Sequence, residues 1–328
     1  MSSRLDRAAD DATRDKILGA ERELAELNAK YGEIAADATL AGASMLPPPA
    51  GTIADVVSLG KSLISGDWGG ALLDTVGFVP LFGDSIKAAG KGTKLLKLAE
   101  ALEVGIKAAK SKLSRLKGGL VAARRAHAAK YWDEIVHAGR KRYDEAIASC
   151  STQACRDAVP VSLKGDHYKL TPADPKKGDW VGGARGDGVW KPKPGNRLSR
   201  ELENFSSNPK LNPSGKPVEG ITYRNGFPEY DDLVVPAVPA RKGQPLRKAQ
   251  VEIPQTGNNG IDFPAADSEL LEATGKTKAM LEDELGTKLT WHHKEDGVTM
   301  QLVPEKVHGA RSGSGHSGGS SLVQTPEY

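Results

Sequence analysis

The sequence predicts an α+β protein, in which a helical amino-terminal region precedes a loop-rich domain that contains a β-hairpin. Three observations predict this class. Apolar residues recur at helical spacing before residue 150, proline and glycine become dense after it, and short alternating runs follow near residue 290. Because a domain typically has roughly 100–200 residues, we predict a helical region over residues 1–150 and a second domain over residues 165–328.

Composition places the chain among globular proteins. Its 328 residues are 38% hydrophobic and 27% charged, and 45 Lys+Arg against 42 Asp+Glu give a net charge of +3. This balance excludes collagen-like, mucin-like and wholly disordered chains. The two cysteines, Cys150 and Cys155, are too few for a disulfide-dense scaffold or for a zinc site with four cysteine ligands. Whether the pair forms a disulfide is left open by the sequence.

The amino-terminal residues differ from a classical export signal. They are charged and lack the apolar run of about 7–15 residues that a signal peptide contains, so we expect any secretion to use another route. The most apolar stretch, residues 69–83, is shorter than the roughly 20 residues of a membrane-spanning helix and includes Asp74. We therefore expect no stable membrane span.

The first helix is predicted by apolar residues spaced three or four apart, which share one stripe and indicate packing against a partner helix. The stripe comprises Ile17, Ala20, Leu24, Leu27, Tyr31 and Ile34. Residues 46–49 are expected to end this segment, with further helices over residues 53–64 and from Asp84 towards Leu102. Together these helices predict a small bundle.

Residues 107–142 form a basic run, with eleven Lys and Arg against two acids. Such a run attracts nucleic acid or an anionic membrane surface. It is also the pattern of a solvated helix face, on which Lys and Arg stems cover apolar neighbours. The sequence alone keeps both interpretations.

The second domain begins with a proline-rich segment. Thirteen of the 20 prolines lie between Pro160 and Pro254, which predicts short strands joined by loops and no helix of any length. After Pro264 the pattern becomes helical, with a break at Gly275 and an end at Gly286. A hairpin is then predicted from strands over residues 288–293 and 298–303 with an Asp-Gly turn, followed by a short helix over residues 304–310.

Four of the seven histidines gather on this hairpin and just after it. They are His292, His293, His308 and His316. Imidazole is the commonest transition-metal ligand and also titrates near neutrality, so a cluster can bind a metal and keep one member as a base. Because successive residues on a strand point to opposite sides, His292 and His293 are expected to differ in role. The remaining histidines, His127, His137 and His167, are isolated, and we treat them as ordinary helix or loop residues.

These residues carry a family resemblance. Thr290-Trp291-His292-His293, then Met300-Gln301-Leu302-Val303-Pro304, His308 and His316-Ser317-Gly318-Gly319 resemble the WHH group of the HNH/endonuclease VII nuclease superfamily. Residues 220–230 are similar to a segment of the toxins that belong to this nuclease group. In that segment a Tyr-x-Asn-Gly turn precedes an aromatic residue, a proline and an acid. The resemblance covers roughly residues 165–328.

The resemblance implies a ββα-metal (His-metal finger) nuclease core that hydrolyses phosphodiesters, usually of DNA, with one divalent ion: Zn, Mg, Mn or Ni. It implies that His292 is a metal ligand, that His293 is the general base, and that His308 and His316 are ligands or orienting groups. The spacer between His308 and His316 is longer than is typical of the family.

Three further residues are candidates for substrate binding. Arg311, beside the cluster, is placed to clamp a phosphate or is a plain surface residue. Trp291 is either a core anchor of the hairpin or a stacking platform for a base. Glu229 is the acid of the upstream motif.

Residues 65–84 resemble the pre-toxin segments that precede the toxins of bacterial polymorphic toxin systems. This resemblance implies a secreted effector of interbacterial competition, delivered to the cytoplasm of a target cell. Its expected partners are DNA, a cognate immunity protein, and a secretion apparatus or adaptor/chaperone. Two alternatives stay open: an RNase toxin of the same fold, and a membrane-perturbing toxin that acts through apolar helices over residues 40–110.

Overall fold

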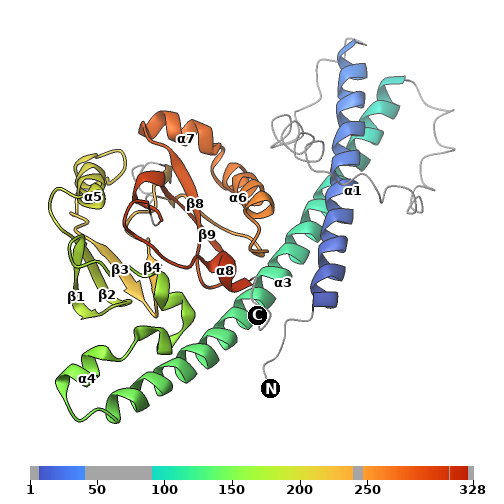
Figure 1. Ribbon diagram of the computed structural model, residues 1–328. Helices are drawn as coiled ribbons and strands as arrows, with labels where there is room; N and C mark the ends of the chain where they lie inside the picture. Colours follow the sequence, from blue (N-terminus) through green and yellow to red (C-terminus); the bar gives the residue numbers. More distant parts are fainter. Residues whose placement is uncertain (1–6, 41–90, 239–246, 310, 324–328) are drawn as a thin grey trace. The chain divides into compact units, whose positions relative to one another are not determined.

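The computed structural model describes residues 7–40, 91–238, 247–309 and 311–323 (Figure 1). The chain divides into two compact units, one over Asp6–Gly119 and one that contains Leu120–Tyr328. The helix expected over residues 53–64, the apolar stretch 69–83 and the pre-toxin-like segment 65–84 lie outside the described residues, as do residues 46–49.

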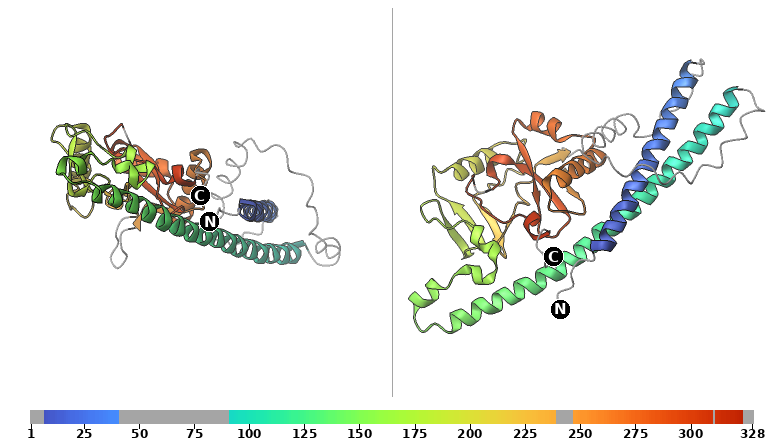
Figure 2. Two further views of the ribbon diagram at one scale, coloured as in Figure 1. Left: turned by 60° about the horizontal axis from the view of Figure 1, so that its bottom comes forward. Right: turned by 45° about the vertical axis from the view of Figure 1, so that its right-hand side comes forward.

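The first unit contains α1 (Arg7–Leu40) and the beginning of α3 (Lys91–Ala148), which run side by side (Figures 1 and 2). Their contact confirms the packing predicted from the apolar stripe, since Leu24 and Tyr31 of α1 pack against Leu102 and Ile106 of α3. The Tyr31 hydroxyl also donates to Glu103 Oε1 at 3.0 Å. The residues described contain no helix that combines the length and apolarity needed to cross a membrane.

The helix α3 continues far beyond the end expected near Leu102. It runs without a break to Ala148, through Gly118 and Gly119, because no proline interrupts residues 91–148. A disulfide joins Cys150, just after this helix, to Cys155 in α4 (Gln153–Ala158), which resolves the question that the sequence left open.

The second unit continues with two short 3₁₀ helices, η2 (Val161–Lys164) and η3 (Asp166–Leu170), and an antiparallel sheet. The strands of this sheet, in their order, are β1 (Gly178–Ala184), β2 (Asp187–Pro192), β3 (Ile221–Arg224) and β4 (Phe227–Glu229). The turn between β3 and β4 is formed by Asn225 and Gly226, both at positive φ (52° and 81°), as tight hairpins require.

The prediction that this segment lacks longer helices is wrong at α5 (Arg197–Ser207). The Asn196 side chain caps the helix by accepting from Ser199 N, and Leu198, Leu202 and Phe205 bury one face. No proline occurs between Pro194 and Pro209, so a helix fits inside an otherwise proline-dense region.

A second sheet carries the histidines. Its strands, in spatial order, are β7 (Gln250–Glu252), β9 (Thr299–Pro304) and β8 (Leu289–His293), while β5 (Pro236–Val238) pairs with β6 (Arg247–Lys248). Between β7 and β8 in the chain lie α6 (Asn259–Thr274) and α7 (Lys278–Leu285). Both helices end at a left-handed glycine, Gly275 and Gly286, which confirms the predicted break and end.

The predicted hairpin is present, but the helix expected over residues 304–310 is not. Pro304 is the last residue of β9, opposite Leu289, and only a 3₁₀ turn, η4 (Glu305–Val307), follows. Gly309, at φ 89°, turns the chain away, so His308 lies on extended backbone after the turn. The next helix is the five-residue α8 (Gly319–Val323). The protein is therefore a mixed helix-and-sheet protein with a helical amino-terminal region.

Candidate metal centre

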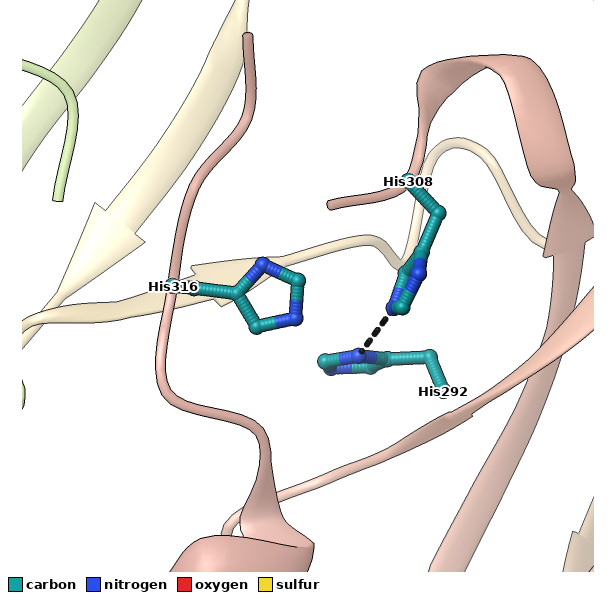
Figure 3. Close-up of side chains that lie close together, drawn as sticks. All are labelled: His292, His308 and His316. Atoms are coloured by element: carbon teal, nitrogen blue, oxygen red, sulfur yellow. Dashed lines mark hydrogen bonds between the residues drawn. The ribbon is translucent and has the colours of Figure 1, made fainter. Parts of the chain in front are cut away.

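Three histidines from separate segments converge on one point (Figure 3). His292 extends from β8, His308 follows η4, and His316 comes from the loop before α8. One ring nitrogen of each lies within 4.8 Å of those of the other two, which is close enough to share a metal ion. His292 Nδ1 and His308 Nε2 are 3.2 Å apart.

The loop that carries His316 is fixed by its serines. Ser314 Oγ donates to the Val307 carbonyl at 2.6 Å, and Gly309 and Ser314 form a β-bridge. The Ser314 carbonyl in turn accepts from His316 Nδ1 at 2.8 Å. Because that nitrogen is the donor, Nε2 of His316 carries the lone pair and is free to bind an ion.

Tyr230 packs against all three imidazoles. Its ring centroid lies 4.7 Å from that of His292, 5.4 Å from that of His308 and 5.7 Å from that of His316. The hydroxyl of this fully buried tyrosine donates to Ser314 Oγ at 3.0 Å. Tyr230 thus joins the sheet side of the site to the loop of His316.

The surroundings of the clustered histidines favour the neutral form of each ring. Burial is the largest cause that holds the pKa of His292 well below its usual value, and it lowers the pKa of His308 to about 3. Burial also lowers the pKa of His316, against the opposing effect of its bond to Ser314. Since metals bind the unprotonated imidazole, these shifts suit a ligand set. His292 is buried, whereas the other two remain partly exposed.

His293 points away from the cluster, as strand alternation predicts. It is 5% exposed, and its Nε2 lies 3.0 Å from Oδ2 of Asp262, in the first turn of α6. Its ring also lies 5.6 Å from that of Phe263. Neighbouring histidines of one strand therefore occupy two different environments.

The three residues predicted to bind substrate lie in different surroundings. Trp291 is 1% exposed, and its Nε1 donates to Asp267 Oδ1 at 2.8 Å. Glu229 forms an ion pair of 3.0 Å with Arg224 across the β3–β4 hairpin. Arg311 is exposed on the loop between His308 and His316. Their role in substrate binding stays a prediction.

Comparison with protein families gives one match. A family model described as the DNase/tRNase domain of colicin-like bacteriocin matches residues 220–318. The match supports a carboxyl-terminal nuclease toxin domain. No curated protein and no solved structure matches the chain.

The segment similar to colicin-like nucleases starts just before β3 and ends after His316, so it contains the three clustered histidines and His293. It also contains two residues to which the sequence analysis gave no role, Tyr230 and Asp262. Tyr230 is the last residue of the motif over residues 220–230, and its place in that motif was the sole sequence feature that could have pointed to a role in the site. No sequence feature pointed to a functional role for Asp262. It lies in the first turn of a helix, where the helix dipole favours an acidic residue in any case.

Proposed function

We propose that the protein is an antibacterial effector whose carboxyl-terminal domain is a metal-dependent HNH-type endonuclease of the WHH group. Its proposed reaction is hydrolysis of phosphodiester bonds in the DNA of a target cell. The observation that carries this proposal is the convergence of three neutral imidazoles inside a segment similar to colicin-like nucleases. The β8–β9 hairpin and the segment after it would form the ββα-metal core, with α8 in place of the expected histidine-bearing helix.

The proposed metal ligands are His292, His308 and His316. The convergence of their ring nitrogens, their lowered pKa values and the free Nε2 of His316 fit one divalent ion. Three nitrogen donors favour Zn or Ni over Mg or Mn, which prefer oxygen. When bound, a divalent cation neutralises negative charge that develops on the phosphate and on the leaving oxygen.

His293 is the proposed general base. Its Nε2 is bonded to Asp262, so Nδ1 is the nitrogen left to accept a proton. In this step water attacks phosphorus, its proton moves to His293 Nδ1, and the bond between phosphorus and the leaving sugar oxygen breaks. A neutral imidazole is suited to this transfer near neutral pH.

We assign the direct substrate contact to the candidate side chain that is exposed to solvent. Arg311 lies on the loop between two proposed ligands, and its exposed guanidinium is the proposed phosphate contact. Trp291 and Glu229 are already paired, with Asp267 and Arg224. We therefore propose that they support substrate binding by holding the two hairpins in place.

RNA is the second candidate substrate, because the matching family is described as acting as DNase or tRNase. The wider setting follows from the resemblances: secretion without a classical signal peptide, delivery to the cytoplasm of a target cell by a secretion apparatus or adaptor, and inhibition by a cognate immunity protein in the producing cell. Perturbation of membranes is the alternative from another class.

One experiment separates these functions. The purified full chain is incubated with supercoiled plasmid, with total tRNA and with dye-loaded liposomes, each with EDTA and with Zn²⁺, Ni²⁺, Mg²⁺ or Mn²⁺ added. We expect plasmid cleavage that EDTA abolishes and that His293→Ala lacks. Cleavage of tRNA alone would make the protein an RNase, whereas dye release without cleavage of either nucleic acid would overturn the nuclease proposal.

A further inference from the structure

The buried carboxylate of Asp262 is held by an unusually complete set of donors. It is 1% exposed and lies in the first turn of α6. Thr256 donates to it from its backbone N at 3.0 Å and from Oγ1 at 2.8 Å, and Gly257 N donates at 2.9 Å. His293 Nε2 is the only side-chain nitrogen among these partners. The carboxylate is thus fixed by hydrogen bonds from the loop before α6, and it also accepts a hydrogen bond from the imidazole of His293.

This arrangement decides which nitrogen of His293 carries the proton. Each of the other contacts uses the carboxylate as an acceptor, so His293 must donate to it through an Nε2–H. A ring that carries its single hydrogen on Nε2 has its lone pair on Nδ1. A buried carboxylate that orients a histidine in this way selects the tautomer and restrains the ring.

We propose that Asp262 is the positioning residue of the nuclease centre, which sets the tautomer and orientation of His293 without touching metal or substrate. This inference rests on the proposed function, because His293 matters to catalysis only if it is the base. His292 points to the other side of β8, so the effect of Asp262 is confined to His293 and leaves the metal ligands in place.

The helix provides a matched control. Asp267 is a second acidic residue of α6 that forms a hydrogen bond with a side chain of β8. Its Oδ1 accepts from Trp291 Nε1 at 2.8 Å. Asp262→Asn and Asp267→Asn therefore make the same chemical change on the same helix, and each faces a residue on β8, His293 or Trp291, which are two positions apart. Trp291 can only donate, so the amide oxygen in the Asp267→Asn variant still accepts from it. An amide at position 262 can instead donate to His293 Nε2, which shifts the proton to Nδ1.

The test uses the full chain with ¹⁵N-labelled histidine and measures tautomers by NMR, with the His293 signals assigned by their loss in His293→Ala. We expect an Nε2–H tautomer in the wild type and in Asp267→Asn, and a population with Nδ1–H in Asp262→Asn. Metal binding, measured by titration with Zn²⁺, should be the same in all three. An Nδ1–H tautomer in the wild type would overturn the proposal, whether or not the Asp262→Asn and Asp267→Asn variants fold.

Kinetics complete the test. Because general-base catalysis is typically worth about 10²–10⁴-fold, we expect Asp262→Asn to lower kcat for plasmid cleavage by at least about 10²-fold with little change in KM, and to add nothing in a His293→Ala background. If His293→Ala is inactive while Asp262→Asn cuts at the wild-type rate, the positioning role is wrong and the base assignment stands. If His293→Ala itself cuts normally, the proposed function of His293 fails first.

Discussion

His292 and His308 face each other with Nδ1 and Nε2 3.2 Å apart, although they are 16 positions apart in the chain. The pairing of β8 with β9, in which His292 lies opposite Gln301, brings the chain back beside the strand. The turn η4 then aims His308 at the same point. In this geometry one nitrogen must carry a hydrogen when the two rings bond to each other, and a metal ion would replace that hydrogen.

Removal of either ring should therefore weaken metal binding strongly. We expect His292→Ala and His308→Ala to bind Zn²⁺ more weakly than the wild type by more than the roughly 10–100-fold that loss of a supporting partner costs. His137→Ala, which changes an exposed histidine of α3, is the control and should bind normally. Bound metal is measured in the purified proteins, and wild-type occupancy in both cluster variants would rule out the ligand assignment.

His293→Ala should separate catalysis from metal binding. Because this side chain faces Asp262 and not the cluster, we expect bound metal and fold to be retained while cleavage falls by about 10²–10⁴-fold. Expression of this variant in a host without the proposed immunity protein should then no longer be toxic. A loss of metal as complete as in His292→Ala would make His293 a ligand instead.

Local sequence patterns predicted the histidines of the site, but not the residues that contact them, Tyr230 and Asp262. Strand alternation separated His292 from His293, and left-handed glycines after α6 and α7 followed from helix-ending rules. The helix expected to carry His308 failed because Pro304 completes β9 and Gly309 reverses the chain. Both features depend on pairing with Leu289 and on the bridge to Ser314, which are tertiary contacts that no local pattern contains.

Tyr230 and Asp262 were missed because they, too, reach the site through tertiary contacts. Tyr230 and Asp262 lie 62 and 31 residues from the histidines that they contact in β8, so only the folded chain brings them there. The expected end of this helix near Leu102 falls inside the part of α3 that packs on α1, and no proline stops the helix before Ala148.

Tyr230→Phe should loosen the loop of His316 without emptying the core. The substitution removes only the hydroxyl that donates to Ser314 Oγ, while the ring keeps its contacts with the three imidazoles. A typical loss of about 1 kcal/mol in the free energy of unfolding is expected, together with weaker Zn²⁺ binding. Denaturant unfolding and metal titration measure the two effects, and unchanged metal affinity would show that the Tyr230 hydroxyl is not needed to hold the loop, which Tyr223 also contacts through the Gly315 carbonyl.

The amino-terminal limit of the nuclease unit can be tested by truncation. We predicted a separately folding domain over residues 165–328, but Trp132 of α3 donates its Nε1 hydrogen to the Glu295 carbonyl at 2.6 Å and packs 4.6 Å from the ring of Phe227. We therefore expect a fragment of residues 120–328 to have a higher Tm than one of residues 165–328, with cleavage in both. Equal Tm values would show that α3 does not stabilise the nuclease unit.

Glu295 should make the unfolding free energy depend on pH. Burial is the largest cause that raises the pKa of its carboxyl from 4.5 to about 7, with Asp296 and Glu229 adding to the rise and Lys294 opposing it. The folded protein therefore binds more protons than the unfolded chain between about pH 4.5 and pH 7, so the free energy of unfolding falls as pH rises through this window and is level above it. One pKa unit is worth about 1.4 kcal/mol, so the fall is at most about 3 kcal/mol.

Glu295→Gln should remove this dependence, because the amide has no proton to lose and keeps the backbone carbonyl that accepts from Trp132. We expect the variant to gain stability over the wild type at pH 8 and to match it near pH 5, as measured by urea unfolding at a series of pH values. Glu305→Gln, at an exposed position after β9, is the control and should leave the profile unchanged. If the wild-type profile were flat between pH 5 and pH 7, the carboxylate of Glu295 would have to be solvated or paired in the folded protein, and burial would not be what raises its pKa.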